Sequence, residues 1–341
     1  MTTKYSSSIF SACSFRIWRR SVGSSKKGGR MRIVLIGETA FGEKVLDTLA
    51  KRGEEIVGVY TSPDIPGRTN PVKQLALQLG IPTFQLKGMR TPEAFEEYVK
   101  LRPDLNVMAY VTTILPESIL DYPTLGTIQW HPSLLPKHKG GSAISWAIVN
   151  GDAKTGITIF WPDKGIDTGP ILLQKEADIS PDDTAGSLYF SKLLPLGVEA
   201  IVESVELIKK GAAPRIPQDE SQSSSEPLFS EKLSVIDWHQ PAGKIYNLIR
   251  GANPRPGATT NSGTRRFKVF DSELLAGVAH GLPGEIIDIT KRGFVVAAPE
   301  GAILIKRVQI EGPTKIEAAD FVKQAALKVG DRLGDHGNAS S

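Results

Sequence analysis

The chain contains 341 residues, 40% of them hydrophobic, with 41 Lys and Arg residues against 37 Asp and Glu residues. This length and mixed composition exclude a fibrous or wholly disordered chain and favour two globular domains. No run approaches the ~18 consecutive apolar residues that cross a membrane, so we expect no membrane partner. The single cysteine, Cys13, excludes a disulfide framework and a cysteine-based zinc site.

The positive charge is concentrated in the first thirty residues, which hold seven basic residues and no acidic one. Residues 31–341 therefore carry 34 basic against 37 acidic residues, and their net charge of −3 gives no reason to expect DNA as a partner. The Ser-rich and Arg-rich residues 1–30 are typical of an organellar targeting segment, which predicts a mitochondrial protein. An extended start before Met31 fits equally well and predicts a cytoplasmic one.

From residue 31 onward, buried strand patterns alternate with amphipathic helix patterns. Apolar runs predict strands at residues 32–36, 55–60, 82–84, 105–110, 126–131 and 156–161. Helical spacing and helix-start signals predict helices after a turn at 37–42, over 73–79, from Thr91 onward, and over 185–210 with an interruption near Pro195. Strands that alternate with helices imply right-handed crossovers, so we expect an α/β domain with a doubly wound, mostly parallel sheet.

The second part of the chain has a different pattern, which follows a stretch rich in Pro, Ser and charge at residues 212–227. A short helical pattern at 242–250 precedes strand-like runs at 267–270, 284–289, 293–298 and 302–308, which predict a smaller, mainly antiparallel β-barrel. The expected organisation is a basic leader at 1–30, a catalytic domain at 31–211, a linker at 212–233, a β-barrel domain at 234–333 and a disordered tail at 334–341.

The first strand, turn and helix invite comparison with a dinucleotide-binding site. However, the turn at residues 37–42 lacks the G-x-G-x-x-G pattern, and no acidic residue closes the second strand, where Tyr60 and Thr61 stand. A dehydrogenase needs that acid to hold the ribose, so we expect no NAD(P) cofactor.

The densest polar grouping in the chain consists of Gln129, His131 and Asp167. The first two are two positions apart on a predicted strand, so their side chains leave the same face. Asp167 lies in a glycine-rich loop after the next long strand, and residues 137–142 predict a flexible basic loop able to cover a ligand. An amide, an imidazole and a carboxylate suit acyl transfer, which needs a donor to the developing oxyanion and a path for the proton.

Simpler interpretations of the same residues remain open. A lone histidine at a strand end is more often structural, and aspartate is common in glycine-rich turns. Ser133 has no G-x-S-x-G around it, which disfavours a serine hydrolase. His131 and His138 lack the H-E-x-x-H spacing of a zinc site, so we expect no metal.

The stretch HPSLLPKHKGGSAISW at 131–146, followed by ITIFWPDKGIDTG at 157–169, resembles the formyltransferase family that uses 10-formyltetrahydrofolate. The likeness extends from about residue 31 to about residue 333 and includes a carboxy-terminal β-barrel. It implies that His131 and Asp167 are the catalytic histidine and aspartate. It also implies a folate site lined by Thr113, Ile114, Leu115, Ser133, Leu134, Leu135 and Pro136.

One residue departs from the pattern of the family's transferases, which carry asparagine two positions before the histidine, where this chain has Gln129. Glutamine keeps the carboxamide but places it one methylene further out. Within the family, the chain most resembles the amino-terminal hydrolase domain of 10-formyltetrahydrofolate dehydrogenase, which also lacks that asparagine, and it resembles methionyl-tRNA formyltransferase as well.

Three formyl acceptors fit the resemblance: water, the amine of methionyl-tRNA and an amino sugar. The segment after the second strand, residues 63–71, is short and has one arginine, and residues 212–341 hold 16 basic against 15 acidic residues. Both features disfavour tRNA as a partner but do not exclude it. The lead interpretation is a stand-alone hydrolase or formyltransferase, the alternative is a methionyl-tRNA formyltransferase, and a non-catalytic folate-binding protein is a further alternative.

Overall fold

The computed structural model describes residues 30–67, 69–85, 89–277, 279–310 and 312–334. The predicted leader, except for Arg30, lies outside these residues, as do Cys13 and all but the first residue of the predicted tail. Every described helix and strand belongs to the unit that begins at Met31.

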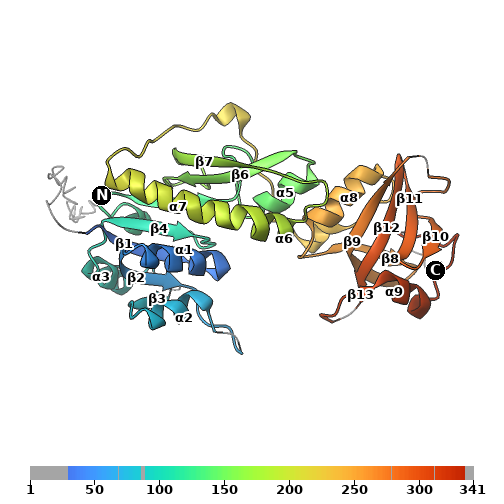
Figure 1. Ribbon diagram of the computed structural model, residues 1–341, viewed down its shortest axis with the longest axis horizontal. Helices are drawn as coiled ribbons and strands as arrows, with labels where there is room; N and C mark the ends of the chain where they lie inside the picture. The colour runs from blue at the N-terminus through green and yellow to red at the C-terminus, as the bar shows by residue number, and fades with distance from the viewer. Residues whose placement is uncertain (1–29, 68, 86–88, 278, 311, 335–341) are drawn as a thin grey trace, which may run out of the picture. The chain divides into compact units, whose positions relative to one another are not determined.

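The first domain is built on a seven-stranded sheet with the order β3-β2-β1-β4-β5-β6-β7 (Figure 1). The strands are β1 (Arg32–Gly37), β2 (Glu55–Thr61), β3 (Thr83–Gln85), β4 (Leu105–Ala109), β5 (Thr127–His131), β6 (Lys154–Phe160) and β7 (Ile171–Asp178). The first five strands pair in parallel, whereas β6 and β7 are antiparallel to their neighbours. The predicted mostly parallel, doubly wound sheet is confirmed, and β7 is a strand that the sequence analysis missed.

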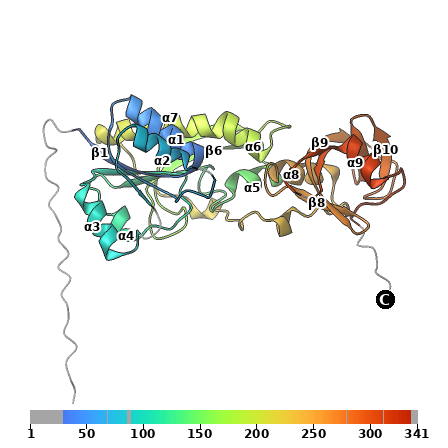
Figure 2. The same ribbon diagram turned by 90° about the horizontal axis from the view of Figure 1, so that it is seen from below.

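Helices cover both faces of this sheet because alternate residues of the buried strands point to opposite sides. Its helices are α1 (Thr39–Lys51), α2 (Pro71–Gln78), α3 (Pro92–Lys100), α4 (Glu117–Leu120), α5 (Ala143–Val149), α6 (Ala185–Leu188) and α7 (Leu194–Lys209). Ile33 and Leu35 of β1 pack with α1, α2 and α7, while Val34 and Ile36 pack with α3 and α4. Figure 2 shows α1 and α7 on one side of the sheet and α3 and α4 on the other.

Local signals at the helix starts agree with this arrangement. The side chain of Asn70 caps α2 by accepting from the backbone N–H of Val72 at 3.0 Å, and Thr91 caps α3 by accepting from Ala94 at 3.3 Å. A π-helical turn at Tyr189–Leu193 separates α6 from α7, directly before Pro195, where the sequence predicts an interruption.

Among the described residues, one helical stretch, Ala185–Lys209, is long and apolar enough by length and composition to cross a membrane. Its α7 part, however, contributes Val198, Ile201, Val205 and Ile208 to the buried core of the first domain. A core helix passes the same test, so the expectation of no membrane partner stays a prediction.

The second domain is a small antiparallel β domain with the strand order β10-β11-β12-β9-β8, to which β13 adds by pairing with β12. Its strands are β8 (Ala258–Ser262), β9 (Arg265–Ala276), β10 (Ile286–Thr290), β11 (Gly293–Ala298), β12 (Gly301–Gln309) and β13 (Ile316–Glu317). Two helices, α8 (Ala242–Gly251) and α9 (Ala318–Ala325), supply residues to its apolar core. Arg332 bridges to Glu285, directly before the edge strand β10, and Leu333 bridges to Ser262, the last residue of the edge strand β8. The segment at 332–333 therefore links the two edges of the sheet. The predicted second, mainly antiparallel domain is confirmed, whereas β8 was not predicted.

The stretch expected to be a linker is in contact with the first domain. Ile216 bridges to Ile171 at the start of β7, and Ser225 bridges to Lys139. Two short 3-10 turns, Glu220–Gln222 and Glu231–Ser234, lie along it. The exact domain boundaries stay a prediction.

Candidate active site

The predicted site lies where β5 ends. Trp130, the residue between Gln129 and His131, points into the core and stacks on Phe41 with ring centroids 4.2 Å apart. Because side chains alternate along a strand, Gln129 and His131 point to the opposite face. In a parallel sheet, β1, β2 and β4 end at the same edge as β5, and loops at such an edge hold the ligands of doubly wound folds.

The structure brings His131 and Asp167 together, as predicted. Nδ1 of His131 lies 3.4 Å from Oδ2 of Asp167, and the two side chains are only 5% and 10% exposed. Asp167 has a φ of 55°, a left-handed conformation that costs a non-glycine residue on the order of 1 kcal/mol. The backbone N–H of Gly140 donates to Oδ2 of Asp167 at 2.9 Å and helps to hold this carboxylate.

The other ring nitrogen of His131 has a fixed partner. Nε2 lies 2.8 Å from the backbone carbonyl of His138, which can only accept, so Nε2 carries the proton. Nδ1 is therefore the nitrogen that faces Asp167 and remains for proton transfer.

Gln129 is half-buried on the same face as His131 and pairs along the sheet with Met108 of β4 and Phe160 of β6. Within the part of the chain that the structure describes, its carboxamide has no hydrogen-bond partner. The amide is thus available to a ligand.

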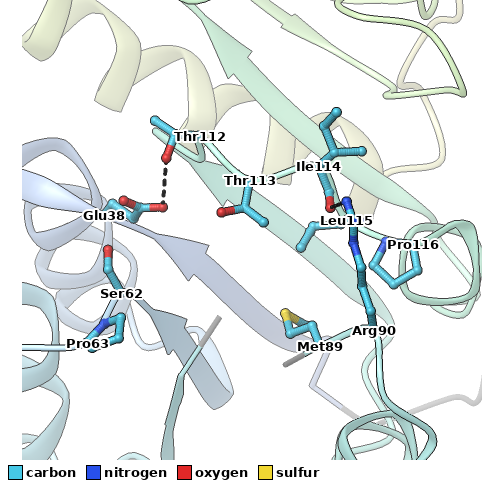
Figure 3. Close-up of a pocket in the computed structure, with 10 residues that line it drawn as sticks. All are labelled: Glu38, Ser62, Pro63, Met89, Arg90, Thr112, Thr113, Ile114, Leu115 and Pro116. Carbon is cyan, nitrogen blue, oxygen red and sulfur yellow. Dashed lines mark hydrogen bonds between the residues drawn. The ribbon is translucent and has the colours of Figure 1, made fainter. Parts of the chain in front are cut away.

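The predicted folate-lining residues fall into two groups. Thr113, Ile114 and Leu115 line a cavity of about 500 Å³ together with residues from the ends of β1, β2 and β4 (Figure 3). The further lining residues are Glu38, Ser62, Pro63, Met89, Arg90, Thr112 and Pro116.

Residues 133–136 do not line that cavity. Ser133 is buried and donates to the Lys137 carbonyl at 2.6 Å, and Leu135 packs against Phe160 and Ile171. Leu134 lines a separate, smaller hollow of about 270 Å³, together with Lys137, His138 and residues 152–155. Their predicted role in folate binding stays a prediction.

The cavity has opposite charges on its walls, as Figure 3 shows. The Glu38 carboxylate accepts from Thr112 Oγ1 at 3.4 Å, while the Arg90 guanidinium donates to the Ile114 carbonyl at 3.1 Å. The Ile114 side chain is 69% exposed, which leaves an apolar wall free for a ligand.

The structure adds residues that the sequence analysis missed. The predicted flexible basic loop at 137–142 is wrong in its first part, since His138 and Lys139 are buried and hydrogen-bonded to the stretch at 212–233. His138 contacts Asp152 and Glu226, which lies 88 positions away in the chain. No local spacing rule connects residues so far apart, so only the fold shows this cluster.

No group of three or more His, Cys, Asp or Glu side chains with the geometry to hold a metal ion occurs among the described residues. The chemistry available here is that of an imidazole, a carboxylate and a carboxamide at the edge of a sheet. These groups can polarise a carbonyl and move a proton.

Comparison with known proteins identifies the class to which this fold and site belong. Residues 31–205 match the formyl transferase family, and residues 230–326 match the formyl transferase C-terminal domain. The chain belongs to the formyltransferase family, which confirms the predicted family and enzyme class.

Two curated relatives differ in how much of their length is matched. Cytosolic 10-formyltetrahydrofolate dehydrogenase from Homo sapiens is 39% identical over 88% of this chain, but the match covers 35% of the relative. The chain thus spans about a third of the length of the dehydrogenases it matches. Methionyl-tRNA formyltransferase from Trichlorobacter lovleyi is 40% identical over 89% of this chain and 98% of the relative.

Solved structures share the fold at low identity. HypX from Aquifex aeolicus in complex with tetrahydrofolic acid has a TM-score of 0.65 at 18% identity and covers 89% of this chain and 49% of that one. The N-formyltransferase from Helicobacter canadensis in complex with folinic acid and dTDP-3-aminofucose has a TM-score of 0.63 at 20% identity, over 81% and 98% of the two chains.

Proposed function

We propose that this protein takes the formyl group of 10-formyltetrahydrofolate, gives it to water or an amine, and releases tetrahydrofolate. The observation that carries the proposal is the buried His131–Asp167 pair at the carboxyl edge of the sheet. Its support is family membership and the cavity at the same edge of the sheet, which is lined by Thr113, Ile114 and Leu115. Names of relatives and of solved structures that contain 10-formyltetrahydrofolate, folinic acid or tetrahydrofolic acid point to the same donor.

The residues have distinct roles in this proposal. Asp167 accepts the proton of the attacking water or amine, and His131, protonated on Nδ1, donates to the oxygen of the formyl group as it becomes negative. The formyl carbon gains a bond to the nucleophile and loses its bond to nitrogen 10 of the folate. His131 delivers the proton that this leaving nitrogen needs, and Asp167 returns a proton to His131. The scheme needs neither a metal nor NAD(P).

Gln129 is the third group in this scheme. Its carboxamide leaves the same face of β5 as His131 and is open to a ligand, so it is placed to donate to the formyl oxygen. The extra methylene relative to asparagine changes how far the donor reaches.

The acceptor separates the lead candidate from the alternative. Water is favoured by the likeness to the hydrolase domain of the dehydrogenases and by the balanced charge of residues 212–341. A methionyl-tRNA acceptor is favoured by the match that spans 98% of the methionyl-tRNA formyltransferase. A folate-binding protein without activity would have no need of the buried pair. Mitochondrial or cytoplasmic localisation stays a prediction.

The test mixes the purified full chain with 10-formyltetrahydrofolate, with and without charged initiator tRNA, and follows release of tetrahydrofolate by absorbance. Release that is independent of RNA supports the hydrolase, and release that requires charged tRNA supports the transferase. An uncharged tRNA control separates a true acceptor from an RNA that only binds. Folate binding without release under either condition would contradict the proposed activity.

A further inference from the structure

We propose that the loop at residues 137–140 and the segment at residues 218–226 together position the catalytic pair, with His138 and Glu226 as positioning residues. This inference rests on the proposed function of the same site. It assigns a role in catalysis to a segment that the sequence presents as a linker between domains.

The loop contacts both members of the pair with backbone atoms of opposite polarity. The carbonyl of His138 accepts from Nε2 of His131 at 2.8 Å, and two residues later the N–H of Gly140 donates to Oδ2 of Asp167 at 2.9 Å. The first bond fixes the proton on Nε2, so that Nδ1 faces the carboxylate. The loop therefore sets both the tautomer of the histidine and the place of the aspartate.

This loop does not hold its shape by local preference alone. His138 has a φ of 55°, and Gly140 a φ of 102°. A histidine in the left-handed region costs on the order of 1 kcal/mol and persists only where surrounding contacts determine it. Those contacts come from a distant part of the chain.

The segment at 218–226 supplies the backbone support. Ser224 accepts the N–H of His138 on Oγ at 2.9 Å and the N–H of Lys139 on its carbonyl at 2.9 Å. The Lys139 ammonium, which is 6% exposed, donates to both carboxylate oxygens of Glu220 at 2.8 Å. Gln218 reaches the other side of the pair, because its amide donates to the carbonyls of Asp167 and Gly169 at 2.8 Å each.

The side chain of His138 also helps to hold the loop in place, through both nitrogens of its ring. Nδ1 lies 3.0 Å from Oε1 of Glu226, and Nε2 lies 2.8 Å from Oδ2 of Asp152. Each ring nitrogen thus faces the oxygen of a carboxylate, and the His138 side chain is only 8% exposed. Two charge-assisted bonds at opposite ends of one ring fix its orientation and hence that of the adjacent carbonyl.

Within the described residues, the second oxygen of Glu226, Oε2, is buried without a hydrogen-bond partner. Burying a carboxylate with one unbonded oxygen is costly unless its other oxygen is well hydrogen-bonded. That other oxygen, Oε1, lies 3.0 Å from His138 Nδ1 and accepts from Ser224 Oγ at 3.3 Å and from Asn150 Nδ2 at 3.4 Å, which meets that requirement. Glu226 thus holds His138 and does not contact the residues that line the ligand cavity, so its removal should loosen the loop rather than that cavity.

The test uses the full chain and the variants Glu226→Ala and Glu226→Gln. The matched control is Glu231→Ala. Glu231 lies in the same predicted linker as Glu226, but its carboxylate pairs with Lys268 of the second domain. Each protein is assayed for kcat and KM in tetrahydrofolate release from 10-formyltetrahydrofolate. The His131 ring is followed by 15N NMR, with its signals assigned from a His131→Gln variant.

We expect Glu226→Ala to lower kcat about tenfold or more, because residues that orient a reacting histidine typically matter by 10–100-fold. KM should change less than threefold, and the His131 ring signals should shift. The kcat of Glu226→Gln should lie between those of the native chain and Glu226→Ala, because the glutamine amide oxygen still accepts from His138 but lacks the charge. Glu231→Ala should match the native chain in all three measurements.

Native kcat and unchanged His131 signals in Glu226→Ala would overturn the inference, and so would an equal loss in Glu231→Ala. If Glu226→Ala fails to fold, Ser224→Ala replaces it, since it removes the acceptor of the His138 N–H and should give the same pattern. A native chain without tetrahydrofolate release refutes the proposed function, and the His131 signals of the variants then still decide whether the segment positions this ring.

Discussion

The two halves of the candidate site are built in different ways. In the catalytic pair, both ring nitrogens of His131 and Oδ2 of Asp167 have protein partners, and both side chains are buried. Around the cavity of Figure 3, the Glu38 carboxylate has one long contact of 3.4 Å, and Ile114 is 69% exposed. One half is held by the protein itself, and the other half is open to a ligand.

This difference indicates which half of the site determines turnover and which half determines ligand binding. A preorganised pair lowers the barrier because it does not have to rearrange during the reaction, so changes there should reduce turnover. An open wall gains its partners only when a ligand arrives, so changes there should weaken binding. Substitutions in the two halves, taken from the largest expected effect to the smallest, test that separation.

The largest effect should come from Asp167→Ala. Removing the carboxylate takes away the base and the partner of the His131 ring, so we expect kcat to fall by about 10²–10⁴. Binding of tetrahydrofolate, measured by calorimetry, should change less than threefold. His131→Ala should behave alike, and full turnover in either variant would remove that residue from the reaction.

The next effect should come from Gln129→Asn, which shortens the open carboxamide by one methylene. If this amide contacts the formyl oxygen, the shorter side chain should raise amine formylation relative to hydrolysis by about tenfold. Gln129→Leu, of similar size but without the amide, should slow both reactions. An unchanged ratio of products in Gln129→Asn would place this side chain outside the reaction.

Much of the first domain could be predicted because its strands are nearly continuous apolar runs between glycine-rich turns. β7 was missed because its sequence, ILLQKEAD, turns polar after three residues, and only pairing with β6 shows that its buried and exposed positions alternate. β8 was missed because its sequence, ATTNS, contains few apolar residues. Its first three residues are nevertheless buried, and Ala258 belongs to the core of the second domain.

The candidate site could be predicted in part for a related reason. Gln129 and His131 lie on one strand, so their common face follows from the period of two. Asp167 could be assigned to the same site from its place after a neighbouring strand and from the resemblance to the family. The contact between His138 and Glu226 could not be predicted, because a polar stretch rich in serine gives no sign of the distant atoms to which it bonds.

A smaller effect should come from the open wall, in the variant Ile114→Ser. The side chain is already exposed, so its loss should leave stability unchanged. If folate covers it, the lost contact of about 1 kcal/mol should raise KM about fivefold with kcat retained. Leu77→Ser, which changes an exposed residue of α2 that does not line the cavity, is the control. An unchanged KM in Ile114→Ser would show that the donor does not use this wall.

The smallest effect on activity should come from Asp183→Asn, which tests whether a well-bonded carboxylate matters for catalysis merely by being well bonded. Its side chain is about as buried as that of Asp167 and accepts from the Ser180 N–H at 2.7 Å, from Lys192 at 2.6 Å and from Ser187 at 3.1 Å. Burial alone would raise the pKa of Asp183, but the bonds from Lys192, Ser180 and Ser187 outweigh it and hold the pKa below its usual value.

A depressed carboxyl pKa adds stability above the unfolded value of about 3.9, and this contribution is lost as the pH falls through the folded value. We therefore expect Asp183→Asn to lower the free energy of unfolding by about 1–3 kcal/mol at pH 7 and to lessen its dependence on pH below about 4. Urea unfolding at pH 7 and at pH 3 measures both. The kcat of the folded variant should equal that of the native chain, because none of these bonds reaches His131, Asp167 or the loop that holds them. A loss of kcat comparable to that of Asp167→Ala would mean that rigidity alone, and not proton transfer by Asp167, explains the sensitivity of the buried half of the site.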